Sequence, residues 1–298
     1  MEAEWIRYST EKFHSTSIMT NVTGNVTLDF RLRLYNEILN CYLPTVIIVP
    51  PFAMPANALV IFLLLFKPGI CCTSEIFTLQ LAIFDMFFCL IIITEYIQFV
   101  WYPSMESANF VAWSLNQAGG PLLLCLLSLD SYVAVCHPLV FLRLKDPRLR
   151  LSMCFVVNVV TASCCLLMKF SRPLRWKVIS VLLCCAIAII STCSVLILRS
   201  LSQTGPGRKE LHPMKKRAFK IMLTSFVLVI VHYSPSSLEY LLRLCDPTLF
   251  GPYSAFTSVT YIVLSLSSVT QPLCYLTRTK KLPCRRGSAA ETKTVATV

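Results

Sequence analysis

The sequence predicts an all-helical membrane protein: a bundle of seven transmembrane helices, with the N-terminus outside the cell and the C-terminus in the cytoplasm. Composition is the first reason, because 55% of the 298 residues are hydrophobic and only 14% are charged. A soluble protein of this size needs more charge to cover its surface. The second reason is a series of apolar segments, each near the roughly 20 residues that span a bilayer. The third is the placement of the basic residues, which gather in alternate connections between these segments.

The N-terminal tail, residues 1–40, is polar and of mixed charge. Asn21 and Asn25 each begin an Asn-X-Thr sequon, and a sequon is glycosylated only on the lumenal, later extracellular, side of a membrane. The first 20 residues lack the apolar core that a signal peptidase recognises, so we expect the tail to stay attached. We therefore predict an extracellular, glycosylated tail.

The transmembrane domain is predicted to cover residues 41–276, followed by a cytoplasmic tail at 277–298. An odd number of spans places the chain ends on opposite sides of the membrane. With the N-terminus outside, most of the 27 lysines and arginines lie in cytoplasmic segments, as the positive-inside rule requires. This agrees with the sequons and predicts a multi-pass protein of the plasma membrane. The predicted spans are 41–66, 75–101, 108–135, 151–169, 176–201, 216–244 and 252–276.

The stretch Leu122–Leu144 combines the third span with the connection that follows it. Its helix is apolar up to Asp130 and ends at His137-Pro138, because proline cannot continue a helix. The motif LSLDSYVAVCHPL resembles the corresponding part of rhodopsin-like (class A) G-protein-coupled receptors, which usually have Asp-Arg-Tyr here and then Pro-Leu. The resemblance implies coupling to a heterotrimeric G protein, and Ser131 replaces the arginine that would reach it.

Asp85 lies midway along the second predicted span, where a charge costs about 2.5 to 3.5 kcal/mol. The resemblance assigns it to the family's polar cluster, which holds a sodium ion, and oxygen ligands around a carboxylate suit such a cation. Gly120 stands where the family usually has a serine ligand, and the alternative is a hydrogen-bonded network that fixes helix packing. Beyond this sodium ion, no metal or cofactor is expected. The polar residues that can face Asp85 are Asn57, Ser267, Ser268 and Gln271.

The sixth predicted span contains His232-Tyr233-Ser234-Pro235, which resembles the family's Cys-Trp-X-Pro. Proline frees a backbone carbonyl and can kink the helix. The resemblance implies a hinge here that lets the inner end of the span move outward. In the seventh span, Gln271 to Tyr275 resembles the family's Asn-Pro-X-X-Tyr. The switch residues that the resemblance implies are Asp130, Ser131, Tyr132, Tyr233, Pro235, Pro272 and Tyr275.

The outer connection between the fourth and fifth predicted spans, KFSRPLRWK at 169–177, is strongly basic. Cations above aromatic side chains suit an acidic or amphipathic ligand, because arginine pairs bidentately with carboxylate or phosphate. The alternative is that these cations extend to lipid headgroups. The candidate ligand-binding residues are Phe99, Trp101, Trp113, Arg172, Arg175, Tyr240, Arg243 and Tyr261.

Most of the 15 cysteines lie in apolar runs, where cysteine behaves as a small hydrophobic residue. The positions of the disulfide that the resemblance implies lack cysteine. Cys41 and Cys245 are both placed at outer ends of spans, and we consider them as a replacement bridge. Cys284, beside two arginines in the tail, is a candidate for palmitoylation.

The leading interpretation is a cell-surface receptor that binds an extracellular ligand and signals by movement of the sixth helix. The third-span motif resembles the nucleotide-, lipid- and peptide-receptor branch, whereas YLTRTKKL in the tail resembles odorant receptors, so a chemosensory role stays open. A non-signalling or decoy heptahelical protein is the alternative. A transporter is disfavoured because no inverted repeat is visible, an enzyme because no nucleophile and base are paired, and a nucleic-acid partner because the basic residues are dispersed.

Overall fold

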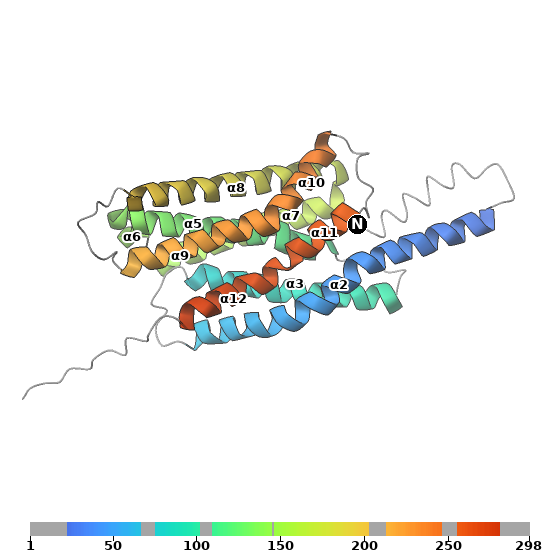
Figure 1. Ribbon diagram of the computed structural model, residues 1–298, viewed down its shortest axis with the longest axis horizontal. Coiled ribbons are helices and arrows are strands. Elements are labelled where there is room, and N and C mark those ends of the chain that lie inside the picture. Colours follow the sequence, from blue (N-terminus) through green and yellow to red (C-terminus); the bar gives the residue numbers. More distant parts are fainter. Residues whose placement is uncertain are drawn as a thin grey trace, which may run out of the picture.

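The computed structural model describes residues 23–66, 75–101, 109–144, 146–202, 213–245 and 255–280. Asn21 and Cys284 lie outside these ranges, and the side chains of Asn25 and Cys41 are likewise not described. Within the described ranges every regular element is helical (Figure 1).

The helices follow one another closely along the chain. In order they are α2 (Thr23–Leu65), α3 (Glu75–Trp101), α4 (Asn109–Ser114), η1 (Leu115–Gly119), α5 (Gly120–Cys136), α6 (Pro138–Arg143), α7 (Pro147–Phe170), α8 (Arg172–Ser202), α9 (Pro213–Leu228), η2 (Val229–Tyr233), α10 (Ser234–Cys245), α11 (Ala255–Ser265) and α12 (Ser267–Lys280). The elements η1 and η2 are single π-helical turns. Since they continue directly into their neighbours, α4, η1 and α5 form one span, and α9, η2 and α10 form another.

Among the described residues, seven helices are long and apolar enough to cross a membrane, which confirms the predicted all-helical bundle of seven spans. The fourth span begins at Pro147 instead of 151, because the Asp146 side chain accepts a hydrogen bond from the Arg148 N–H at 2.9 Å and caps the helix. The seven spans are Leu43–Leu65, Glu75–Gln98, Phe110–Cys136, Pro147–Phe170, Lys177–Ser200, Phe219–Cys245 and Phe256–Thr277.

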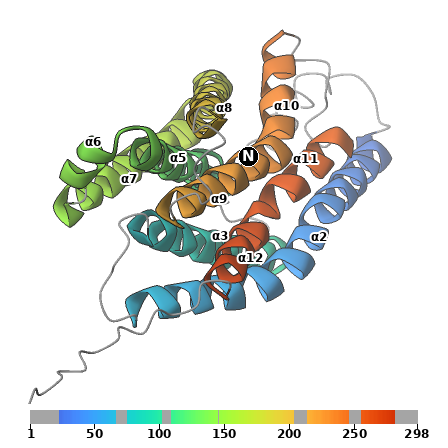
Figure 2. The ribbon, with the colours of Figure 1, turned by 60° about the vertical axis from the view of Figure 1, so that its left-hand side comes forward.

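The third span lies at the centre of the bundle, where α5 packs against α3, α7, α8 and α9 (Figure 2). Its inward residues Leu123, Leu124 and Leu127 form the main apolar core together with residues such as Leu183 of α8. Large apolar side chains on the outward faces, for example Phe62, are exposed. This arrangement is the one expected when lipid surrounds the helices.

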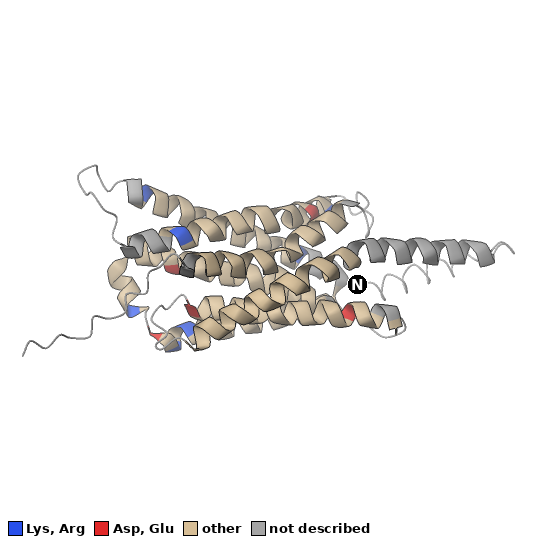
Figure 3. Cartoon of the chain, turned by 60° about the horizontal axis from the view of Figure 1, so that its bottom comes forward, with Lys and Arg blue, Asp and Glu red and all other residues tan. Residues whose placement is uncertain are grey.

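The two ends of the bundle differ in charge. The start of α2 and the end of α12 lie at opposite ends (Figure 1). Figure 3 shows that the basic residues among those described gather mainly at the end that carries α6. We call this the α6 end, and the opposite end, where α10 stops at Cys245, the α10 end.

Candidate functional site

A buried polar cluster joins the first, second and seventh spans around Asp85. The Ser268 hydroxyl donates to Asp85 Oδ1 at 2.7 Å, and the Asn57 amide donates to the Ser268 carbonyl at 3.0 Å and to the Ala53 carbonyl at 3.0 Å. The Ser268 carbonyl needs an outside donor because Pro272, one turn later, has no N–H. Asn57 is therefore placed to compensate for the proline of the seventh span.

The same cluster reaches the two π-helical turns. The Ser267 hydroxyl donates to Asn116 Oδ1 in η1 at 3.3 Å, and the Gln271 amide donates to the Tyr233 hydroxyl in η2 at 3.3 Å. The five predicted polar residues thus lie in one region, and Asn116 and Tyr233 extend the region to the third and sixth spans.

His232 makes a second link between the sixth and seventh spans. Its Nδ1 lies 2.6 Å from the Val263 carbonyl, which requires a proton on Nδ1, so Nε2 accepts from the Thr270 hydroxyl at 3.0 Å. The break between α11 and α12 at Leu266 leaves the Val263 carbonyl one turn before an interrupted helix. Sequence reasoning missed His232 as a contact residue, because nothing in the sequence shows where the seventh span is interrupted.

Gly120 and Tyr233 both depart from the family pattern, and the two departures compensate for each other. A Cβ atom added to Gly120 would lie 2.6 Å from the hydroxyl oxygen of Tyr233, which is buried. The tyrosine hydroxyl therefore occupies the space that a serine side chain at 120 would need. Glycine at 120 and tyrosine at 233 form a matched pair across the third and sixth spans.

The oxygen atoms around Asp85 are of the kinds that could bind the sodium ion that the resemblance implies. Asp85 Oδ2 and the amide oxygens of Asn57 and Gln271 are buried and have no hydrogen-bond partner among the described residues. Carboxylate and amide oxygens are the ligands that hard cations take. Within the same part of the chain, no three His, Cys, Asp or Glu side chains gather to bind a transition metal.

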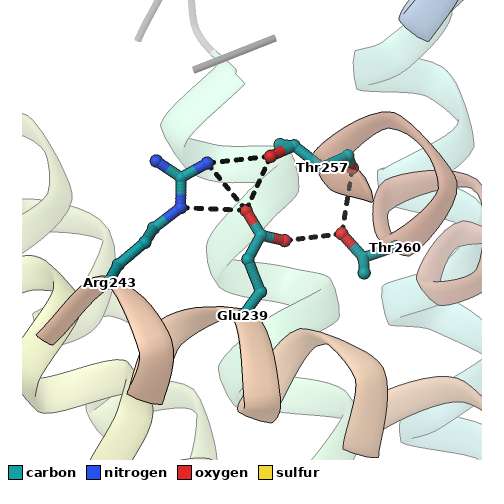
Figure 4. Close-up of polar contacts among 4 residues, drawn as sticks. All are labelled: Glu239, Arg243, Thr257 and Thr260. Carbon is teal, nitrogen blue, oxygen red and sulfur yellow. Dashed lines mark hydrogen bonds and ion pairs between the residues drawn. The ribbon is translucent and has the colours of Figure 1, made fainter. Parts of the chain in front are cut away.

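At the α10 end, four residues form a polar cluster that we call the Glu239 clasp: Glu239, Arg243, Thr257 and Thr260 (Figure 4). Glu239 Oε1 accepts from Arg243 Nε at 3.0 Å and from the Thr257 hydroxyl at 3.0 Å, and lies 2.9 Å from Arg243 Nη2. Its Oε2 accepts from the Thr260 hydroxyl at 2.5 Å. The Glu239 and Arg243 side chains are only 6% and 13% exposed. The clasp joins α10 to α11, and so the sixth span to the seventh.

The structure brings together some of the predicted ligand-binding residues. The Trp113 and Tyr261 rings stack with centroids 5.0 Å apart, and Tyr240 is buried in the core. Arg243 is paired with Glu239, a partner that the sequence analysis overlooked although the two are four residues apart on one helix. Trp101, at the end of α3, is 73% exposed. The side chains of Phe99, Arg172 and Arg175 lie outside the described part of the chain.

At the α6 end, Asp130 forms an ion pair with Arg150 of α7, with 2.6 Å between Oδ1 and Nη2. The neighbouring Ser131 is buried, and its hydroxyl donates to the Leu127 carbonyl of its own helix at 2.8 Å. The predicted fourth span begins at 151, which leaves Arg150 in the cytoplasmic connection before it. The structure instead buries it, because the cap at Asp146 places Arg150 in the first turn of α7, facing α5.

The other predicted switch residues are distributed along the spans. Tyr132 lies 3.2 Å from His137 Nε2. Pro235 follows η2, in which the Ser234 N–H bonds to the Val229 carbonyl in π-helical fashion. Tyr275 packs against the apolar cluster of the first and second spans. Cys245 is exposed at the end of α10. Because the side chain of Cys41 lies outside the described residues, the bridge between the two stays a prediction.

A bundle of seven spans, with a buried polar cluster that links five of them, defines a heptahelical membrane protein of the receptor type. Residues 56–177, from the first span to the start of the fifth, match the family model described as 7 transmembrane receptor (rhodopsin family). Together with the seven spans, this match supports the resemblance to rhodopsin-like receptors that the motifs predicted. No curated protein matches the chain.

Proposed function

We propose that the chain is a cell-surface receptor that binds an extracellular ligand at the α10 end and signals to a heterotrimeric G protein at the α6 end. The observation that carries this proposal is the construction of the sixth span. It contains a π-helical turn that ends at Tyr233, two residues before Pro235, with polar contacts to the seventh span at this turn and toward the α10 end. Helix irregularities of this kind mark functional hinges.

The proposed orientation places residues 1–40 outside, the spans of 41–276 in the membrane and the tail of 277–298 in the cytoplasm. The two sequons in the N-terminal tail support it. The basic residues at the α6 end in Figure 3 also support it, because cytoplasmic connections carry an excess of lysine and arginine.

The contacts on the two sides of the hinge differ in kind. Toward the α10 end, the sixth span is tied to the seventh by the directional bonds of the Glu239 clasp. Toward the α6 end, Met222 of α9 packs against Val135 and Ile197 in a small apolar cluster. Apolar contacts have no preferred direction, so α9 can slide over its neighbours. In this proposal, a change in the Glu239 clasp therefore moves α9 about the hinge at Pro235. A ligand drives this movement only by binding the moved state more tightly.

The ligand that fits the proposal carries a carboxylate or phosphate and an apolar part. Its anionic group would take Arg243 from Glu239, while the hydroxyls of Thr257 and Thr260 keep Glu239 hydrogen-bonded. Its apolar part would contact the Trp113 and Tyr261 rings. A sodium ion held by Asp85, Asn57 and Gln271 would offset the buried charge of Asp85.

The test is G-protein nucleotide exchange in membranes that contain the full chain, screened with acidic small molecules, peptides and odorants. Glu239→Gln should raise basal exchange, because the clasp loses its charge. Thr224→Val is the matched control, since that exposed hydroxyl bonds only to the Lys220 carbonyl of its own helix, at 2.9 Å. Arg243→Ala should abolish responses to acidic ligands alone.

The outcomes of the screen separate the alternatives. Surface binding of a ligand with no exchange in any variant would favour a non-signalling or decoy protein, which Ser131 in place of the family arginine also favours. Responses confined to odorants would favour a chemosensory receptor. Unchanged acidic-ligand responses in Arg243→Ala would remove the clasp from the ligand site.

A further inference from the structure

Arg150 contacts more separate elements than its place beside a loop suggests. Its Nη2 pairs with Asp130 of α5 at 2.6 Å, and its Nε donates to the Leu144 carbonyl, directly after α6, at 3.0 Å. Its guanidinium also lies over the ring of Phe77 in α3 at 5.6 Å and over that of Phe141 in α6 at 5.8 Å. One side chain therefore connects the second, third and fourth spans with the helix between them.

Burial makes this arrangement persistent. The Arg150 side chain is 2% exposed and that of Asp130 is 12% exposed. Removing one partner of such a pair leaves a charge without compensation in a medium that solvates it poorly, which is strongly unfavourable. The guanidinium pairs with the carboxylate through Nη2 while its Nε–H donates to the Leu144 carbonyl, an arrangement that a single ammonium group does not reproduce.

The neighbouring position offers Asp130 no competing cation. Ser131 is buried, its hydroxyl is satisfied within its own helix, and it carries no charge. The resemblance implies an arginine at 131, and this chain has none there. Here the positive charge comes from another span.

We propose that Arg150 is a positioning residue that serves as the counter-ion of Asp130 and fixes α5, α6 and α7 as one unit at the α6 end. The unit does not open when a ligand binds. This proposal rests on the proposed function only for its role in signalling, where it confines the movement to the sixth span. The α6 helix, with Leu139 and Leu142 exposed, is then held in one position whether or not a ligand is bound.

The test is a double-mutant cycle on the purified full chain in lipid nanodiscs, with thermal unfolding as the measurement. Asp130→Asn and Arg150→Met should each lower Tm by about 6–10 °C. The Tm of the double variant should fall no further than that of the less stable single variant, because neither charge is then left unpaired. Arg148→Met, an exposed arginine of the same helix, is the control and should shift Tm by about 1 °C or less.

A milder variant separates the ion pair from the tether to the loop. Arg150→Lys keeps the charge and loses the Nε–H that bonds Leu144. Its Tm should fall by less than the Tm of Arg150→Met. Amide hydrogen exchange in the peptide 138–144 should be faster than in the wild type. This arm still decides the matter if the other single variants do not fold.

Additive losses in the cycle, or single variants no worse than Arg148→Met, would overturn the ion pair as the fixing contact. Unchanged exchange in Arg150→Lys would overturn the tether to α6. Neither measurement uses a ligand or a G protein. A failure here therefore leaves the receptor proposal standing, and a receptor that activates nothing leaves this unit standing.

Discussion

Gly120→Ala should destabilise the protein, although alanine is favoured over glycine by about 1 kcal/mol in a helix interior. The added Cβ would lie 2.6 Å from the Tyr233 hydroxyl oxygen, far inside van der Waals contact. Tyr233 is 1% exposed and packs in the main core, so its ring has little room to move. Overpacking of this kind costs about 1–3 kcal/mol. The net effect is a loss of up to about 2 kcal/mol, or a Tm lower by up to about 4 °C.

The assay is thermal unfolding of the full chain in detergent, followed by tryptophan fluorescence, for Gly120→Ala, Tyr233→Phe and the double variant. Tyr233→Phe alone should cost about 1 kcal/mol, because Gln271 loses its acceptor. The double variant should be no less stable than Tyr233→Phe, since the phenylalanine ring has no hydroxyl for the new methyl group to meet. Tyr240→Phe, a change at another buried tyrosine, should not relieve Gly120→Ala. A stabilising Gly120→Ala, or costs that simply add, would refute the reasoning.

Three further outcomes are expected. Gly119→Ala should lower Tm by about 2–6 °C, because its Cβ would lie 2.5 Å from the Phe84 ring, and Phe84→Leu should restore part of the loss; full tolerance of the alanine would contradict this. His232→Phe should cost about 1–3 kcal/mol in thermal unfolding and raise basal nucleotide exchange, since a buried carbonyl of the seventh span loses its donor; an unchanged Tm would count against the link. Asn21→Gln and Asn25→Gln should each increase gel mobility by one glycan, and identical mobility of both variants and the wild type would argue against an extracellular N-terminus.

The seven spans could be predicted from the sequence because a helix that crosses hydrocarbon must be long and apolar, and each of these segments has that length and composition. The gathering of polar residues around Asp85 could also be anticipated, because a charge in a span must face inward. The hydrogen bond from Asn57 to the carbonyl freed by Pro272 follows from the same logic once the two helices are adjacent.

The two ion pairs were missed for different reasons. Glu239 and Arg243 have the spacing of a helical pair, so the signal was present in the sequence and unused. Arg150 lies one residue before the predicted fourth span, although Asp146-Pro147 is a helix start that places it within the span. The π-helical turns carry no sequence signal that we recognise. One of them ends at Gly119, where the chain closely approaches the Phe84 ring.

These turns have an evolutionary consequence. Each π-helical turn accommodates a surplus residue, and a residue in an α-helix advances the helix face by about 100°. Because the turn absorbs this residue locally, deleting a single codon within Leu115–Gly119 would convert the turn to α-helix and leave Trp113 and Asp130 facing nearly the same directions as before. A deletion within Val229–Tyr233 would do the same for Glu239 and α9. Either turn can thus be removed in one genetic step while the helix faces on both sides of it are kept.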